Sequence, residues 1–176
     1  MKSFVKALLL MGVAIPAGAD TALVVGTVDA ASTTSYGAPR YLGTALTPLD
    51  QAGFELISAL DADAATLRQL VTRLVTADEQ EALVIALSGR FVTHGGLSWF
   101  LGRDAGQQDL GSVSAAGIPV QLLMDIAGAS PARAVILLAP EDQGIALGAG
   151  LDNGLGPLEV PEGVTLATGH PASVAR

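Results

Sequence analysis

The sequence contains no cysteine and only 2 histidines among its 176 residues. The first absence excludes disulfide-stabilised scaffolds, zinc sites built on thiolates, iron–sulfur clusters and every mechanism that needs a cysteine nucleophile. The second argues against metal sites that use several imidazoles. We therefore expect neither a metal centre nor a cofactor.

Basic residues are also scarce, and the formal net charge is −8. Proteins that bind nucleic acid need a concentrated cationic face that displaces counterions from the phosphates, so this charge argues against a nucleic-acid partner. The sequence has no Gly-x-Gly-x-x-Gly pattern and no Walker lysine, and hence no dinucleotide or phosphate signature. What it does have is 50% hydrophobic and 15% charged residues, the composition of one globular domain with a sizeable core.

The first nineteen residues have the composition of an export signal. Lys2 and Lys6 flank the start, an apolar run covers residues 7–15, and small residues at 17–19 suit a signal peptidase. Because this run is shorter than the about 20 residues that span a bilayer core, a cleaved signal peptide is favoured over a retained membrane anchor. We predict a mature domain over residues 20–176, periplasmic or secreted, with no membrane contact after cleavage. Loss of both lysines would lower its formal charge to −10 (−8 − 2).

Apolar runs of strand length recur along the mature chain. Each run is apolar at successive positions, which is the pattern of a strand buried on both faces, and such strands are usually parallel. The predicted strands cover residues 22–25, 54–57, 83–87, 134–138 and 164–167.

Helices are predicted between these strands. The clearest has one apolar stripe, and either Asp61 or Asp63 can cap it. Another is predicted from near Pro119 to Gly128. The alternation of strands and helices implies right-handed crossovers and a layered α/β/α domain. The stripe consists of Leu67, Leu70, Val71, Leu74 and Val75.

Three other stretches give weaker patterns. Residues 27–52 predict a loop and a short or broken helix, because Pro48 would interrupt a long one. Residues 99–101 after Gly95–Gly96 predict one arm of a small hairpin, and the glycine-rich residues 144–156 predict a loop.

Polar residues follow three of the predicted strands, at Gly26–Asp29, Ser88–Arg90 and Ala139–Asp142. Ligands and catalytic groups gather beyond the carboxyl ends of the strands in an open parallel sheet. We therefore expect these three strand ends to converge in one cleft.

The order of the segments resembles the caspase and metacaspase superfamily of cysteine peptidases, in its bacterial caspase-like branch. The segments that carry the resemblance are, in the family's order, ALVVG, AGFEL, LSGR, GGLSWFLGRDA and AVILLAPEDQG. The resemblance covers the chain from Thr21 onward. It implies the three-layer α/β/α fold of that superfamily, with a mostly parallel central sheet.

The resemblance also implies a catalytic histidine in a Ser-Gly-His motif after the third strand and a nucleophilic cysteine after the fourth. Here Ser88-Gly89 is followed by Arg90, and Glu141 stands at the cysteine position, 51 residues on (141 − 90). The family's spacing is about 50 residues. Arginine stays protonated and cannot act as the general base, and a carboxylate is a poor nucleophile toward an amide. We interpret the chain as a pseudopeptidase with no catalytic residue.

The degenerate cleft is then interpreted as a site for a peptide or a protein. If the family geometry holds, the Arg90 guanidinium and the Glu141 carboxylate form an ion pair across it; the alternative is two independent solvated charges. The candidate binding residues are Arg40, Ser88, Gly89, Arg90, His94, Glu141 and Asp142.

Some of these polar residues also have an interpretation that assigns them no role in binding or catalysis. Arg40 lies in the predicted loop before the first helix, where aspartate-specific caspases hold a pocket arginine, but a surface salt bridge is the default. His94 has no cysteine to activate, so we expect an exposed hairpin histidine, and His170 is interpreted as a turn residue. Asp104 is expected to end the hairpin in a structural role; the alternative is one of two acids for glycoside hydrolysis.

Two wider alternatives stay open. One is a hydrolase with a non-cysteine nucleophile, for which Ser88 and Ser98 are candidates, although neither has a Gly-x-Ser-x-Gly elbow. The other is a fragment, since members of the superfamily continue after the fifth strand with another helix and strand. In that case the last strand is missing, and the bare sheet edge invites pairing with another chain.

Overall fold

The computed structural model describes residues 20–27, 38–77, 81–130, 133–141 and 146–169 of the chain. The predicted export signal over residues 1–19 lies outside this part, as do Asp29, Asp142 and His170.

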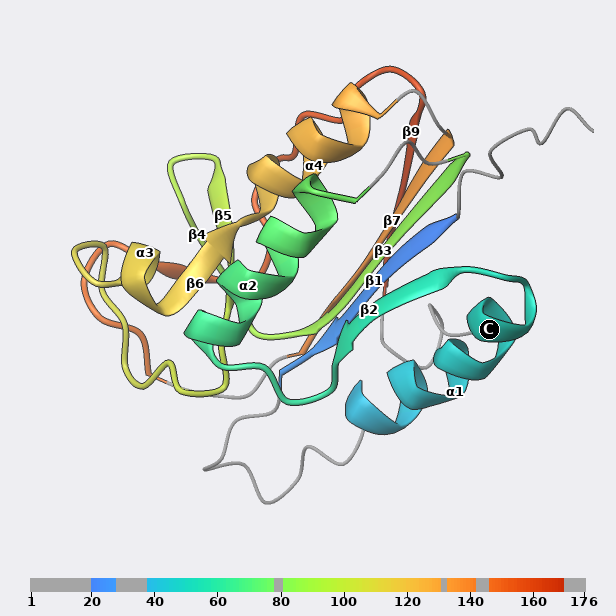
Figure 1. The fold of residues 1–176 in the computed structure, drawn as a ribbon. Helices are drawn as coiled ribbons and strands as arrows, with labels where there is room; N and C mark the ends of the chain where they lie inside the picture. Colours follow the sequence, from blue (N-terminus) through green and yellow to red (C-terminus); the bar gives the residue numbers. More distant parts are fainter. Residues whose placement is uncertain (1–19, 28–37, 78–80, 131–132, 142–145, 170–176) are drawn as a thin grey trace, which may run out of the picture.

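A sheet of five parallel strands forms the centre of the molecule, in the order β2-β1-β3-β7-β9 (Figure 1). All five predicted strands are present, with bounds that differ by a few residues from those expected. Their parallel pairing confirms the predicted direction. The prediction of burial on both faces is wrong for β2 and β9, which are the two edge strands and have most of their residues exposed or half-buried. The strands are β1 (Thr21–Gly26), β2 (Glu55–Ala59), β3 (Ala82–Gly89), β7 (Arg133–Pro140) and β9 (Val164–Thr168).

Helices cover both faces of this sheet, so the chain has a mixed α/β fold. Figure 1 shows α2 (Ala64–Val75) and α4 (Val120–Ala129) on one face and α1 (Ala38–Gln51) on the other. Of the two predicted caps for α2, Asp63 is the one used, and its carboxylate accepts the N–H of Thr66 at 2.8 Å. No helix in the described part of the chain is both long and apolar enough to cross a bilayer.

The prediction of a short or broken helix before β2 is wrong, because α1 is a continuous helix of 14 residues that contains Pro48. Pro48 lies in the last turn, where it removes one backbone hydrogen bond and leaves the earlier turns intact. Leu42, Leu46 and Leu49 pack this helix against the sheet. Burial of these leucines outweighs the local cost of the proline.

A second, antiparallel sheet lies beside the first, in the order β6-β5-β4-β8. Its centre is the predicted hairpin, with Gly95 and Gly96 in the turn at φ values of +55° and +86°, which suit a two-residue turn with positive φ at both positions. The additions of β6 and β8, the latter inside the predicted loop, were not anticipated, because strands this short carry no periodic pattern. The elements are β4 (Phe91–His94), β5 (Leu97–Leu101), β6 (Gly117–Pro119) and β8 (Asp152–Asn153), with the short helix α3 (Val113–Ala116) before β6.

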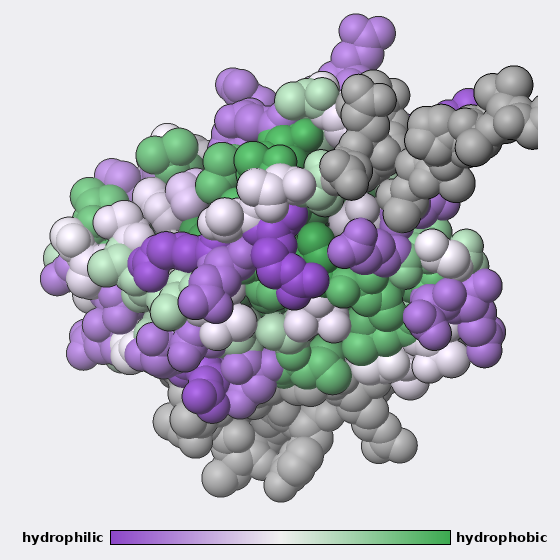
Figure 2. Space-filling model, viewed as in Figure 1, coloured by the Kyte–Doolittle hydropathy of each residue, from purple (hydrophilic) through white to green (hydrophobic). Residues whose placement is uncertain are grey.

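The main core lies between the central sheet and the α2/α4 layer. It includes buried side chains from every strand of the central sheet except β9, and it continues into the hairpin through Phe91 and Phe100, whose ring centroids are 5.0 Å apart. Among the side chains that the structure describes, the cluster on the α1 face is much smaller. Figure 2 shows further hydrophobic residues on the surface over β2, between α2 and α1, where the sheet has its edge.

Candidate functional site

The carboxyl ends of β1, β3 and β7 form one row, and the cleft that the sequence predicts there stays a prediction. The Thr27 N–H, just after β1, donates to the Ser88 carbonyl at 2.9 Å. On the other side of β3, Gly89 pairs with Pro140, and the Glu141 N–H donates to the Gly89 carbonyl at 2.8 Å. These two bonds carry the sheet's pairing into the residues that follow the strands. Residues far apart in the sequence therefore lie next to one another at this edge.

Ser88 and Glu141 are in contact through their side chains. The Ser88 hydroxyl is fully buried and donates to Oε1 of Glu141 at 3.4 Å, which is long for a hydrogen bond. Glu141 itself is half-buried, so part of its side chain reaches solvent. The row therefore presents a carboxylate whose position a buried hydroxyl helps to fix.

Arg90 is buried with 5% of its surface exposed. Its Nη2 donates to the carbonyl oxygens of Ala105 and Gly106, the latter at 3.2 Å, and so ties the segment after the hairpin to the end of β3. A guanidinium stays protonated at all relevant pH values. Arg90 is therefore a donor and an anchor, and it cannot accept a proton. The ion pair between Arg90 and Glu141 stays a prediction.

Gly89 is held by close packing. Its φ is +149°, and a Cβ placed on it would lie 2.1 Å from Oγ1 of Thr27 and 3.2 Å from Cε2 of Phe100. Only glycine fits such a position. The Thr27 hydroxyl is itself buried and has no hydrogen-bond partner among the described residues. The sequence pointed to the strand end that contains Thr27 but gave no reason to single out this residue.

Two predicted binding residues lie elsewhere. Arg40 belongs to the first turn of α1, so its predicted place in a loop is wrong. The prediction expected Pro48 to shorten or break this helix, whereas α1 is continuous from Ala38 to Gln51. His94 ends β4 and is exposed, as expected. Because β4 has four residues, His94 lies about 13 Å along the strand from Arg90, at roughly 3.3 Å per residue. It belongs to the tip of the hairpin, away from the row.

Asp104 has a structural contact that agrees with the expected role. Its carboxylate accepts the N–H of Ala64 at 2.9 Å, which ties the end of the hairpin to the first turn of α2. The adjacent Arg103 pairs with Asp61 at 3.0 Å on the surface. Bonds from the Thr66 backbone N–H, and then from the Thr66 side chain, hold the pKa of Asp63 below its ordinary value of 3.8. These carboxylates secure the start of α2.

Within the described residues, no group of three or more histidines or carboxylates is placed to hold a metal ion. The sequence matches no protein-family model and no curated protein.

Proposed function

We propose that this protein is an exported caspase-like domain that has lost peptidase chemistry and binds a peptide or protein segment at the row formed by Ser88, Gly89, Arg90 and Glu141. Strand pairing supports the family part of this proposal. The resemblance places the two dyad positions after the third and fourth strands of the sheet, and those strands, β3 and β7, are neighbours. The bond of the Glu141 N–H to the Gly89 carbonyl brings the two positions together.

The observation that carries the loss of activity is the environment of Arg90. Where the family has a histidine that exchanges a proton near neutral pH, this chain has a buried guanidinium that donates to the carbonyls of Ala105 and Gly106. The position is thus used to fix the segment after the hairpin. With a carboxylate at the second position and no cysteine in the chain, nucleophile and base are both absent from the dyad.

The same row has groups that suit an extended peptide. The Glu141 carboxylate, which is half-buried, can accept hydrogen bonds from backbone N–H groups or from a charged side chain. Gly89 is buried against Thr27 and Phe100, so Glu141 is the residue of this row that reaches solvent and can meet a peptide. We therefore propose that the carboxyl edge of the sheet, at the position of the peptidase cleft in the family, binds a peptide.

A double substitution, Arg90→His with Glu141→Cys, tests the family assignment. If the geometry is caspase-like, the imidazole lies within reach of the thiol and lowers its pKa, and the thiol reacts with iodoacetamide at pH 6 about tenfold faster than in Glu141→Cys alone. The double variant should also cleave members of a fluorogenic peptide library, whereas the wild type and both single variants should not. Equal thiol reactivity in a folded double variant would contradict the assignment.

Binding is tested separately on an array of short peptides. We expect Glu141→Ala to weaken the signals that the wild type gives, and Asp50→Asn to leave them unchanged, because Asp50 is an exposed carboxylate on α1, away from the row. Signals that do not change with Glu141→Ala would exclude the row as the binding site.

The contact between Ser88 and Glu141 favours one other function, a hydrolase with Ser88 as the nucleophile and Glu141 as the base. Against it stands the full burial of the Ser88 side chain, which keeps a substrate from its hydroxyl. A fluorophosphonate probe distinguishes the two functions. Labelling of Ser88 in the wild type, lost in Glu141→Gln, would favour the hydrolase and overturn the pseudopeptidase.

A further inference from the structure

We propose that Asn153 is a site of spontaneous covalent modification, at which the side-chain amide becomes a carboxylate, and that the pairing of β8 with β4 sets the rate. Asn153 is the only asparagine in the chain, and a glycine follows it. The inference depends on the chemistry of these two residues, on their exposure and on one backbone hydrogen bond. It does not depend on the proposed function of the row.

The reaction needs only Asn153, Gly154 and water. The backbone nitrogen of Gly154 gives up its proton and bonds to Cγ of Asn153, while the bond from Cγ to the side-chain nitrogen breaks. That nitrogen takes up the proton and leaves as ammonia, and a five-membered succinimide ring remains. Water then adds to either ring carbonyl carbon, and the ring bond from that carbon to nitrogen breaks. The products are aspartate or isoaspartate, in which the backbone is one methylene longer.

The surroundings of Asn153 and Gly154 leave room for this ring. Asn153 is exposed, so water reaches its amide, and asparagine is one of the chemically labile residues. Gly154 has no Cβ to hinder attack by its nitrogen, and a Cβ placed on it would meet none of the described atoms within 4 Å. Its φ is +92°, which glycine adopts readily. Access to the two residues therefore does not limit the reaction.

One hydrogen bond opposes ring closure. The Gly154 N–H donates to the Phe91 carbonyl at 2.9 Å, next to the pair that Asn153 forms with Val92. While this bond is present, an acceptor stabilises the proton that must leave, and the nitrogen is fixed in the line of the strand. Ring closure therefore requires β8 to separate from β4.

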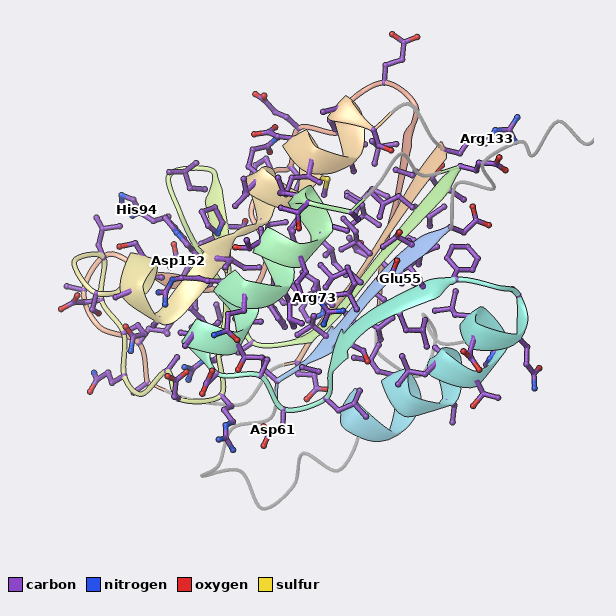
Figure 3. All side chains as sticks on the ribbon, in the orientation of Figure 1. Glu55, Asp61, Arg73, His94, Arg133 and Asp152 are labelled. Carbon is purple, nitrogen blue, oxygen red and sulfur yellow. The ribbon has the colours of Figure 1, made fainter. Side chains whose placement is uncertain are left out.

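This separation should occur without unfolding of the rest of the chain. β8 has two residues and lies at the edge of its sheet, where β4 is its one neighbour among the described strands. Figure 3 shows Asp152, its first residue, at the end of the molecule that carries the hairpin. Short edge segments open locally at a lower free energy than core strands. The apolar anchor of β8 is Leu151, which is 8% exposed and packs in the cluster that contains Val92 and Trp99.

Modification should make the separation permanent. In isoaspartate the added methylene lies between Asp152 and Gly154, so the pair of Asp152 with Thr93 and the bond of Gly154 to Phe91 no longer fit the same register. The new carboxylate also adds a negative charge next to Asp152, in a chain whose net charge is already −8. Asn153 is thus a point at which the antiparallel sheet loses its edge strand irreversibly.

The experiment incubates the full chain at mildly alkaline pH and follows residue 153 by peptide mapping with mass spectrometry, which resolves an amide from a carboxylate. The wild type should be modified about 10 to 100 times more slowly in buffer than in urea, because only the open state reacts. Leu151→Ala should accelerate the reaction in buffer about tenfold, since it removes the anchor of β8. The matched control, Leu137→Ala, truncates a leucine on β7 and should change the rate less than about twofold.

Three results would overturn the proposal. The first is an equal rate for the wild type in buffer and in urea, which would mean that the bond to Phe91 exerts no control. The second is a rate in buffer more than about 100 times slower than in urea, which would mean that β8 does not open locally. The third is equal acceleration by Leu151→Ala and Leu137→Ala, which would mean that the whole chain must unfold.

Hydrogen exchange of the wild type gives a second measurement, which stands even if Leu151→Ala does not fold. The Gly154 N–H should exchange at least about tenfold faster than the N–H of Ile85 in the centre of β3. Equal exchange at the two positions would contradict local opening and would also overturn the proposal.

Discussion

The two faces of the central sheet differ in how completely they are covered. On the α2/α4 face, the strands contribute fully buried leucines and isoleucines to one large cluster. On the α1 face, the buried members among the described side chains are Ala22, Val24, Leu42 and Ala86, and the other large side chains packed against them are only half-buried. Neighbouring residues of β7 show the contrast, since Ile136 is fully buried and Leu137 is half-buried. Stability should therefore be concentrated on one face, although the apolar runs alone suggest two equal ones.

The largest expected effect tests this contrast within one strand. Ile136→Ala should lower the free energy of unfolding by about 2–5 kcal/mol, because it leaves a cavity in the large cluster. Leu137→Ala should lower it by about 1–2 kcal/mol, because its side chain is already partly in solvent and its surroundings can relax. Urea unfolding measures both, and equal losses would mean that the faces contribute alike.

A second substitution asks whether the large cluster extends to the carboxyl edge, where Phe100 lies beside Gly89. Gly89→Ala should cost about 1–3 kcal/mol, since its φ is positive and its Cβ would collide with Thr27. Gly95→Ala is the matched control, because Gly95 also has a positive φ but nothing lies within 4 Å of its Cβ. The additional loss of unfolding free energy in Gly89→Ala, relative to Gly95→Ala, measures the packing around Gly89. Equal losses in the two variants would show that the residues around Gly89 move to make room for the added methyl group.

Arg90 lies next to Phe91 of the large cluster but is held by polar bonds. Arg90→Met should cost about 1.5–3 kcal/mol, because the carbonyls of Ala105 and Gly106 lose a charged donor. Hydrogen exchange should become faster around residues 105–106 while β3 stays protected. Uniform acceleration over the whole chain would contradict this, because it would mean that the anchor supports the entire fold.

The smallest effect concerns the start of α2, on the well-covered face. Because the folded pKa of Asp63 lies below its ordinary value of 3.8, the stability that its charge provides is fully present above that value and disappears as the pH falls through the folded pKa. Asn is also a good cap, so Asp63→Asn isolates the charge. Its melting temperature should be below that of the wild type at neutral pH, and the two should converge in acid. Thermal scans measure this difference, with exposed Asp152→Asn for comparison; a difference that grows in acid would contradict the expected sign.

Local pattern was sufficient for the five strands of the central sheet, for α2 with a cap at either Asp61 or Asp63, and for the hairpin turn at Gly95–Gly96. Each of these depends on interactions between residues close in sequence or on an apolar run. How far each run is buried depends on its place in the sheet, since β1 is fully buried whereas the edge strands β2 and β9 are largely not. The prediction for α1 was wrong because it considered the local cost of Pro48 in the last turn of the helix. It did not include the stabilisation from burial of Leu42, Leu46 and Leu49 against the sheet.

By itself, the sequence determined the chemistry that is missing and the strands that must be buried. No cysteine is present, Arg90 cannot act as a base, and the apolar runs require a parallel sheet with helices between its strands. Tertiary structure alone decided the order of the strands, the contact of Gly89 with Thr27, the bonds of Arg90 to a segment fifteen residues away, and the unequal cover of the two faces. The reason is that these features depend on which distant surfaces meet, and a residue's neighbours in the chain do not encode its neighbours in space.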